Sequence, residues 1–137
     1  MEIAVIDGQG GGLGKAIIEK LSREIGDSAT IIALGTNSMA TTSMLKAGAH
    51  IGATGENAIV VTAHKVDVII GSVGILAANS MLGECTPRIA EAIGSSSAKK
   101  ILVPLNRCGL EIIGTNGQPL PVLIDALVTK IRDMIKE

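Results

Sequence analysis

The sequence predicts a three-layer α/β domain with a parallel sheet of about five strands and helices on both faces. Two observations lead to this fold class. Short, almost continuously apolar runs, at 3–6, 29–34, 66–70 and 101–105, have the composition of parallel strands buried on both faces. These runs alternate with turns and helix-like segments, which is the order that builds a parallel sheet. The 137 residues are expected to form a single domain.

The composition restricts the classes of function. Apolar residues make up 47% of the chain and charged residues 18%, so a folded globular domain is expected. Aromatic residues are absent. No tyrosine can therefore act as a catalytic acid, and no aromatic ring can stack on a base, a flavin or adenine. The formal net charge is −1 and there is no basic run, so neither nucleic acid nor a membrane is an expected partner.

A cytoplasmic location is expected from three features. The chain opens on a strand without a signal peptide. No apolar run reaches the length of about 18 residues that spans a bilayer. Its two cysteines, Cys85 and Cys108, do not form a disulfide framework.

The first strand, 3–7, leads into a glycine-rich turn around which the chain is organised. Gly8, Gly10, Gly11, Gly12 and Gly14 fall within seven positions, together with Gln9 and Leu13. A simple turn needs only one or two residues with positive φ, and further glycines let a large anion approach the backbone. A helix over 15–25 follows, which completes the arrangement that binds phosphate at a helix N-terminus. The seven residues are therefore predicted to bind a nucleotide or dinucleotide, the alternative being a tight turn without a ligand. Asp7 is expected to stabilise the loop.

The second strand, 29–34, ends where a dinucleotide-binding domain meets the adenosine ribose. Thr36 and Asn37 stand there and are candidate cofactor-binding residues. NAD-binding domains usually carry an acidic residue at this point, and neither an acid nor a base for a 2′-phosphate is present. The equal alternative is that these residues only cap the next helix, 39–47, for which Ser38 is the expected N-cap.

The stretch from 48 to 65 is the least clear. Residues 49–53 are predicted as a short strand or a loop, and Thr54 as the cap of a short helix over 55–63. His50 and His64 have no matching ligand set nearby, so no metal site is predicted. The roles of both histidines and of Cys85 stay open.

The next strand, 66–70, delivers a turn to the same edge of the sheet as the glycine-rich turn. Gly71, Ser72 and Val73 in this turn are candidate cofactor-binding residues. A long helix is predicted from 75 to 93, with an interruption near Gly83. Because this segment is apolar on more than one side, it is the predicted interface of a homodimer.

The strand at 99–105 leads to Asn106 and Arg107, which are further candidate binding residues, because a guanidinium binds phosphate or carboxylate with two parallel bonds. With Cys108 as a nucleophile, Arg107 also supports the alternative of a small enzyme, in which Ser72 takes part. A last short strand is predicted at 110–114, and a final helix at 122–136.

The segment 8–17 resembles the cofactor loop of short-chain dehydrogenases, and 67–76 resembles the Asp-Val-Leu-Val-Asn-Asn-Ala-Gly-Ile-Leu pattern of that family. The resemblance implies the binding half of a Rossmann domain, with NAD or NADP as candidate cofactor. It does not imply hydride transfer, because the family's Tyr-x-x-x-Lys pair is missing. The whole sequence also resembles a small family of Rossmann-like proteins from anaerobic Firmicutes without an assigned activity, which implies a fold but no function.

These observations predict a small cytoplasmic Rossmann-like protein that binds a nucleotide without dehydrogenase chemistry. NAD, NADP or another nucleotide is the expected ligand. Whether a reaction is catalysed stays open. The alternatives are the small enzyme based on Arg107 and Cys108, and a regulatory or structural subunit that binds a partner protein.

Overall fold

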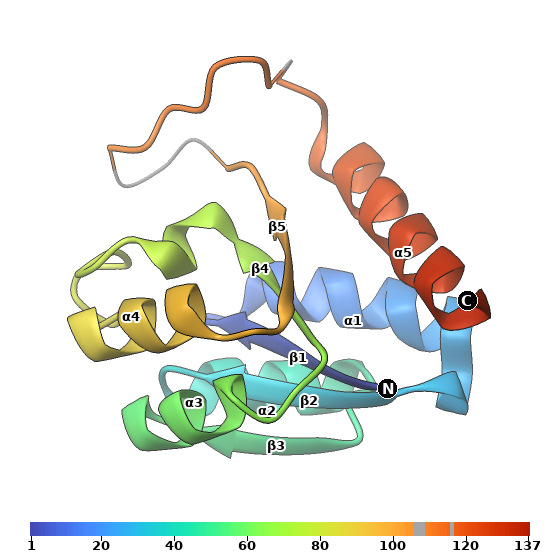
Figure 1. The fold of residues 1–137 in the computed structure, drawn as a ribbon, viewed down its shortest axis with the longest axis horizontal. Helices are drawn as coiled ribbons and strands as arrows, with labels where there is room; N and C mark the ends of the chain where they lie inside the picture. Colours follow the sequence, from blue (N-terminus) through green and yellow to red (C-terminus); the bar gives the residue numbers. More distant parts are fainter. Residues whose placement is uncertain (106–108, 116) are drawn as a thin grey trace.

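The protein is an α/β fold with a five-stranded, all-parallel sheet between two layers of helices, as predicted (Figure 1). The computed structural model describes residues 1–105, 109–115 and 117–137. The strand order is β3-β2-β1-β4-β5. The strands are β1 (Glu2–Asp7), β2 (Thr30–Gly35), β3 (Ile51–Thr54), β4 (Val68–Ser72) and β5 (Lys99–Val103). The helices are α1 (Gly12–Ile25), α2 (Ser38–Ala47), α3 (Glu56–Ala63), α4 (Pro87–Ser95) and α5 (Leu120–Lys136), with 3-10 turns η1 (Gly26–Ser28) and η2 (Val73–Leu76).

Alternate residues of β1 enter two separate hydrophobic cores, because successive side chains of a strand point to opposite faces. Ile3 and Val5 are fully buried in the core beneath α1 and α5. Ala4 and Ile6 are buried in the core on the other face, beneath α3 and α4. Both faces of the central strand are therefore covered, which explains the continuously apolar run.

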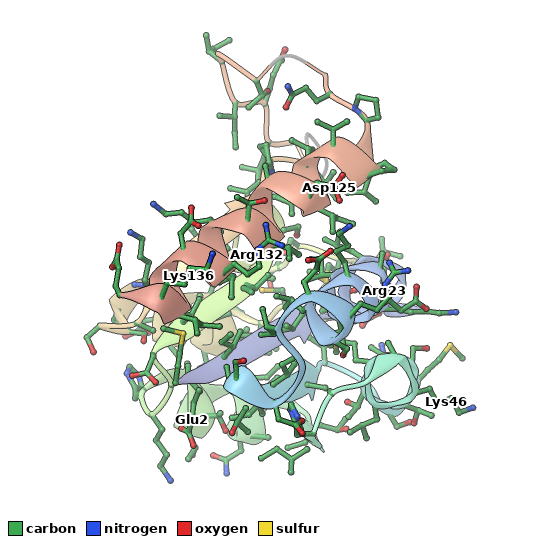
Figure 2. All side chains as sticks on the ribbon, turned by 90° about the vertical axis from the view of Figure 1, so that its right-hand side faces the viewer. Glu2, Arg23, Lys46, Asp125, Arg132 and Lys136 are labelled. Carbon is green, nitrogen blue, oxygen red and sulfur yellow. The ribbon has the colours of Figure 1, made fainter. Side chains whose placement is uncertain are left out.

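Helix α5 packs beside α1 on one face of the sheet (Figure 2). Ile124, Leu127, Val128 and Ile131 form its buried stripe, and they recur at the helical spacing seen in the sequence. At the rim, Arg132 Nη1 lies 2.7 Å from Glu24 Oε2 of α1. Both side chains are partly exposed, so burial of the apolar stripe, and not this ion pair, holds the two helices together.

The observed helix caps correct two predictions. Asn37, not Ser38, is the N-cap of α2, and its Oδ1 accepts a hydrogen bond from Ala40 N at 2.9 Å. Gly55, not Thr54, precedes α3, with a φ of 101° that a threonine would rarely adopt. The segment that was ambiguous between strand and loop contains β3, the edge strand beside β2.

The predicted helix over 75–93 is wrong before Pro87, whereas its predicted interruption near Gly83 is confirmed. The short turn η2 is followed by a loop, and α4 begins only at Pro87, with Thr86 as its N-cap. Within the loop, Asn79, Met81 and Leu82 have φ values of 66°, 57° and 55°, which no right-handed helix contains. The apolar residues of this stretch therefore belong to a loop and not to a helix.

Residues 109–115 and 117–119 lie beyond the carboxyl end of β5 (Figure 1). Residues 110–114 form no strand within the described part of the chain, so that prediction is wrong and β5 is the edge of the described sheet. The predicted binding residues Asn106 and Arg107, and Cys108, lie outside the described residues. Helix α5 begins two positions before the predicted 122. Among the described residues, the helices are too short or too polar to cross a lipid bilayer.

Candidate functional site

A cavity of about 480 Å³ opens at the carboxyl ends of β1 and β4. In the sheet, β1 lies between β2 and β4. The chain continues from β1 to β2 and β3 on one side and then crosses to β4 on the other side, so the strand order reverses at this cavity. Crevices at such points are the common ligand sites of open α/β sheets. The cavity is lined by Asp7, Gly8, Gln9, Gly10, Gly11, Gly12, Leu13, Ser72, Gly74, Met81, Leu105 and Leu120.

The five glycines of the turn fall into two groups when a Cβ atom is placed on each. At Gly8 the added atom would lie 2.6 Å from Thr36 Oγ1, and at Gly11 it would lie 2.8 Å from the Cα of Ala40. At Gly14 it would meet the thioether of Met44. Packing against the backbone of α2 requires glycine at Gly11, whereas at Gly8 and Gly14 an added Cβ would force neighbouring side chains to shift.

The packing of the turn does not require glycine at Gly10 or Gly12. A Cβ on either would meet nothing within 4 Å, and both residues are exposed. Neither has the positive φ that favours glycine. The fold alone does not explain these two glycines, and both line the cavity. A ligand that lies directly on the backbone would explain them.

Within the described part of the chain, hydrogen bonds leave three backbone amides of the turn unpaired. Asp7 accepts hydrogen bonds from Gly8 N at 2.8 Å and Gly14 N at 2.7 Å. The amides of Gln9 and Gly11 donate to Glu84 and to the Gly8 carbonyl.

Among the described residues, no protein acceptor pairs with the amides of Gly10, Gly12 and Leu13. All three residues line the cavity and lie at the start of α1, where the helix dipole favours an anion. The turn can therefore hold a phosphate through backbone donors.

The remaining walls of the cavity are mostly apolar. Ser72 is the last residue of β4 and supplies a hydroxyl. Two aliphatic side chains complete the walls, Leu105 just after β5 and Leu120 at the start of α5. Of the other predicted residues in this turn, Gly71 and Val73 do not line the cavity. Gly71 instead packs closely, because a Cβ there would lie 2.9 Å from the Ile6 carbonyl oxygen.

Thr36 and Asn37 do not line the cavity either, because both bind a carboxylate of the protein. Glu84 Oε1 accepts hydrogen bonds from Thr36 Oγ1 at 2.7 Å, Gln9 N at 2.8 Å and Asn37 Nδ2 at 2.8 Å. The Thr36 hydroxyl, followed by the Gln9 amide and the Asn37 amide, lowers the pKa of Glu84 below its ordinary value. Glu84 thus joins the glycine turn to the end of β2 as a carboxylate.

Reasoning from the sequence missed Glu84, because the residue was placed inside a predicted helix. The sequence signal for a loop in this stretch was a set of residues that favour turns or helix starts, namely Asn79, Gly83 and Pro87. Nothing in the spacing of the sequence links Glu84 to Gln9, which lies 75 positions earlier.

The structure gives His50 and Cys85 structural roles. His50 Nδ1 accepts a hydrogen bond from Ile31 N at 2.9 Å, and its Nε2 lies 3.0 Å from Asp27 Oδ1. Cys85 is buried, with its Sγ 3.4 Å from the carbonyl oxygen of Ile75. In the described ranges, no three His, Cys, Asp or Glu side chains gather as a metal site would require.

Three comparisons relate this chain to known proteins. The family DUF3842, described as a domain of unknown function, matches residues 2–136. No curated protein matches the chain. Among solved structures, the chain is similar to a dodecameric FMN-dependent UbiX-like decarboxylase from Escherichia coli O157:H7, with 14% sequence identity and a TM-score of 0.53. The match covers 100% of this chain and 96% of that chain, and at this identity it shows a shared fold.

Proposed function

Since the chain belongs to the family DUF3842, a domain of unknown function, we propose a function from the site itself. The protein binds a nucleotide-like ligand whose phosphate lies on the glycine turn. The observation that carries this proposal is the set of three amides, at Gly10, Gly12 and Leu13, that line the cavity without a protein acceptor among the described residues. A phosphate offers three oxygens to such donors, and the helix dipole of α1 favours its charge.

The size and walls of the cavity support the same class of ligand. A volume of about 480 Å³ lies within the ordinary range of small-molecule pockets. FMN is a candidate because the structural neighbour is an FMN-dependent enzyme. NAD and NADP are candidates because the turn resembles the cofactor loop of short-chain dehydrogenases, and other nucleotides share the same phosphate chemistry.

Gly12→Val is expected to abolish ligand binding while leaving the fold intact. A Cβ at this position meets no protein atom within 4 Å, and the added side chain would project from the segment whose amides are to receive the phosphate. Thermal unfolding with FMN, AMP, ATP, GTP, NAD, NADP, FAD, coenzyme A and cyclic dinucleotides would be measured for both proteins. Binding at a hundredfold excess over Kd stabilises the native state by about 2.7 kcal/mol, which raises the melting temperature clearly.

Gly94→Val is the matched control, because Gly94 is also an exposed helical glycine with open space around its Cβ position. It does not line the cavity, so this variant should respond to the ligand as the wild type does. The proposal fails if no compound at millimolar concentration stabilises the wild-type protein. It also fails if Gly12→Val binds as tightly as Gly94→Val.

The two alternatives from the sequence stay predictions. The small-enzyme hypothesis rests on Arg107 and Cys108, which lie outside the described residues, and on Ser72, which lines the cavity. Rapid reaction of Cys108 with iodoacetamide at neutral pH would support it. A partner protein that is retained by Gly12→Val would support a regulatory or structural subunit.

We also propose that the chain forms a homodimer through the loop part of the predicted 75–93 interface, and not through its α4 part. Ile89 and Ile93 of α4 are buried in the chain's own core and cannot form an interface. Leu82, at the tip of the loop before α4, is 98% exposed, and Leu76 is 40% exposed. A second copy would remove these leucine side chains from water.

Leu82→Glu is therefore expected to dissociate the dimer. Light scattering at micromolar concentration should give twice the 13.9 kDa chain mass for the wild type and the single chain mass for the variant. Ile113→Glu is the control, because Ile113 is 91% exposed on a different segment. A monomeric wild type, or a dimer that survives Leu82→Glu, would contradict this interface.

A further inference from the structure

We propose that Glu84 and Met81 close the β2 side of the glycine turn, so that the ligand is a mononucleotide and not a dinucleotide. This inference rests on the proposed function, namely a ligand phosphate on the turn. It deepens that proposal by naming the class of ligand and the residues that select it.

The first argument is the place that Glu84 occupies. In dinucleotide-binding domains, the adenosine ribose lies at the end of the second strand, beside the glycine turn. Here the Glu84 carboxylate lies at that place, bound within 2.8 Å to Thr36, Gln9 and Asn37. Asn37 Nδ2 also donates to the Gln9 carbonyl at 2.9 Å. Thr36, Asn37 and one oxygen of Glu84, which lie where a ribose would bind, are therefore already hydrogen-bonded within the protein.

The second argument is the space beside Gly8. A Cβ on Gly8 would lie 2.7 Å from Met81 Sδ and 3.1 Å from Glu84 Oε1. Both side chains therefore lie next to Gly8. Met81 lines the cavity, whereas Glu84 and Thr36 do not. The cavity therefore ends at the Met81 side chain, before it reaches the end of β2.

The third argument is the backbone that positions these two side chains. Met81 and Leu82 have left-handed φ values, which non-glycine residues rarely adopt unless their surroundings require it. Ser80 Oγ donates to the Gly74 carbonyl at 2.6 Å, and Cys85 N donates to the Ser80 carbonyl at 3.1 Å. The loop is thus anchored to the same turn, η2, that borders the cavity. The strained backbone of the loop thus holds the side chains of Met81 and Glu84 in one position.

The fourth argument is charge. The three donors around Glu84 stabilise its ionised form, so this side of the turn carries a negative charge. A pyrophosphate that extended towards β2 would meet this carboxylate. The open direction runs from the free amides past Ser72 and Gly74, towards the aliphatic walls. A single phosphate ester with its organic part on that side fits the cavity.

The experiment compares each mononucleotide with the dinucleotide that contains it. Dissociation constants for FMN and FAD, and for AMP and NAD, would be measured by calorimetry on the full chain. The wild type is expected to bind its preferred mononucleotide at least about tenfold more tightly than the matching dinucleotide. The double variant Met81→Ala/Glu84→Gln opens the space and removes the charge, so this preference should fall to about threefold or less.

Glu91→Gln is the matched control, since it removes one negative charge from the exposed surface of α4. It should keep the wild-type preference. A wild type that binds FAD or NAD more tightly than FMN or AMP overturns the inference, and this result needs no variant. Weaker dinucleotide binding by Glu84→Gln would also overturn it, because Glu84 would then accept hydrogen bonds from a ribose. Absence of binding by all four compounds would also contradict the inference if another member of the panel bound, whereas absence of binding by the whole panel would be a failure of the proposed function.

Discussion

Replacing Asp7 by alanine is expected to lower the free energy of unfolding by about 3 kcal/mol, because a buried carboxylate that receives two backbone amides is lost. Asp7 is only 9% exposed, at the last position of β1. Its two oxygens accept hydrogen bonds from Gly8 N and Gly14 N, which lie at opposite ends of the glycine turn. The variant would leave both amides without this acceptor. Chemical denaturation followed by circular dichroism would measure the change.

Asp67→Ala provides the comparison. The Asp67 carboxylate also accepts a backbone hydrogen bond, from Glu2 N at 2.7 Å, but this bond is exposed. Water can replace the lost acceptor there, so the expected loss of stability is only about 0.5–1 kcal/mol. Equal effects of the two substitutions would contradict the role assigned to Asp7, since burial would then not matter. Ligand affinity should also fall in Asp7→Ala, because the turn would lose its anchor.

Gly11→Ala is expected to destabilise the protein by about 2–3 kcal/mol, because a left-handed non-glycine residue and a steric contact both carry a cost. Gly11 has a φ of 74°. Its added Cβ would lie 2.8 Å from the Cα and 2.9 Å from the carbonyl oxygen of Ala40. These are backbone atoms of α2, so they cannot move aside as a flexible side chain could. Thermal and chemical unfolding of the purified variant would measure the loss.

Gly10→Ala separates the folding role of the turn from its binding role. Gly10 has no positive φ, and its added Cβ would meet nothing within 4 Å. Its stability should therefore stay within about 0.5 kcal/mol of the wild type, since it is a surface position without a special backbone conformation. If Gly10→Ala destabilised the protein as much as Gly11→Ala, the division of the glycines into two groups would be wrong.

The strands and most helices could be predicted because their signals are local. The apolar run at 3–6 and the apolar spacing over 122–136 each indicate one type of element, buried in one way. Both elements are observed, as β1 and α5, close to the expected bounds. The glycine turn was recognised for the same reason, since strand, turn and helix follow one another along the chain.

The stretch from 75 to 86 could not be predicted in this way. Its alanine, methionine and leucine residues have favourable helix propensities, which indicated a helix. Contacts with distant residues decide otherwise, among them the hydrogen bonds between Glu84 and Asn37. Tertiary contacts can outweigh propensities, which differ by less than about 1 kcal/mol per residue.

The sequence by itself determined the fold class, most of the order of strands and helices along the chain, and the position of the glycine turn. These features depend on periodicity and on residues that are neighbours in the sequence. Only the tertiary structure decided which glycines are closely packed, because Gly8, Gly11 and Gly14 are defined by contacts with the distant residues Thr36, Ala40 and Met44. It also decided that Glu84 meets Gln9 beside Thr36, since this contact forms only after the parallel strands have brought their carboxyl ends to one edge.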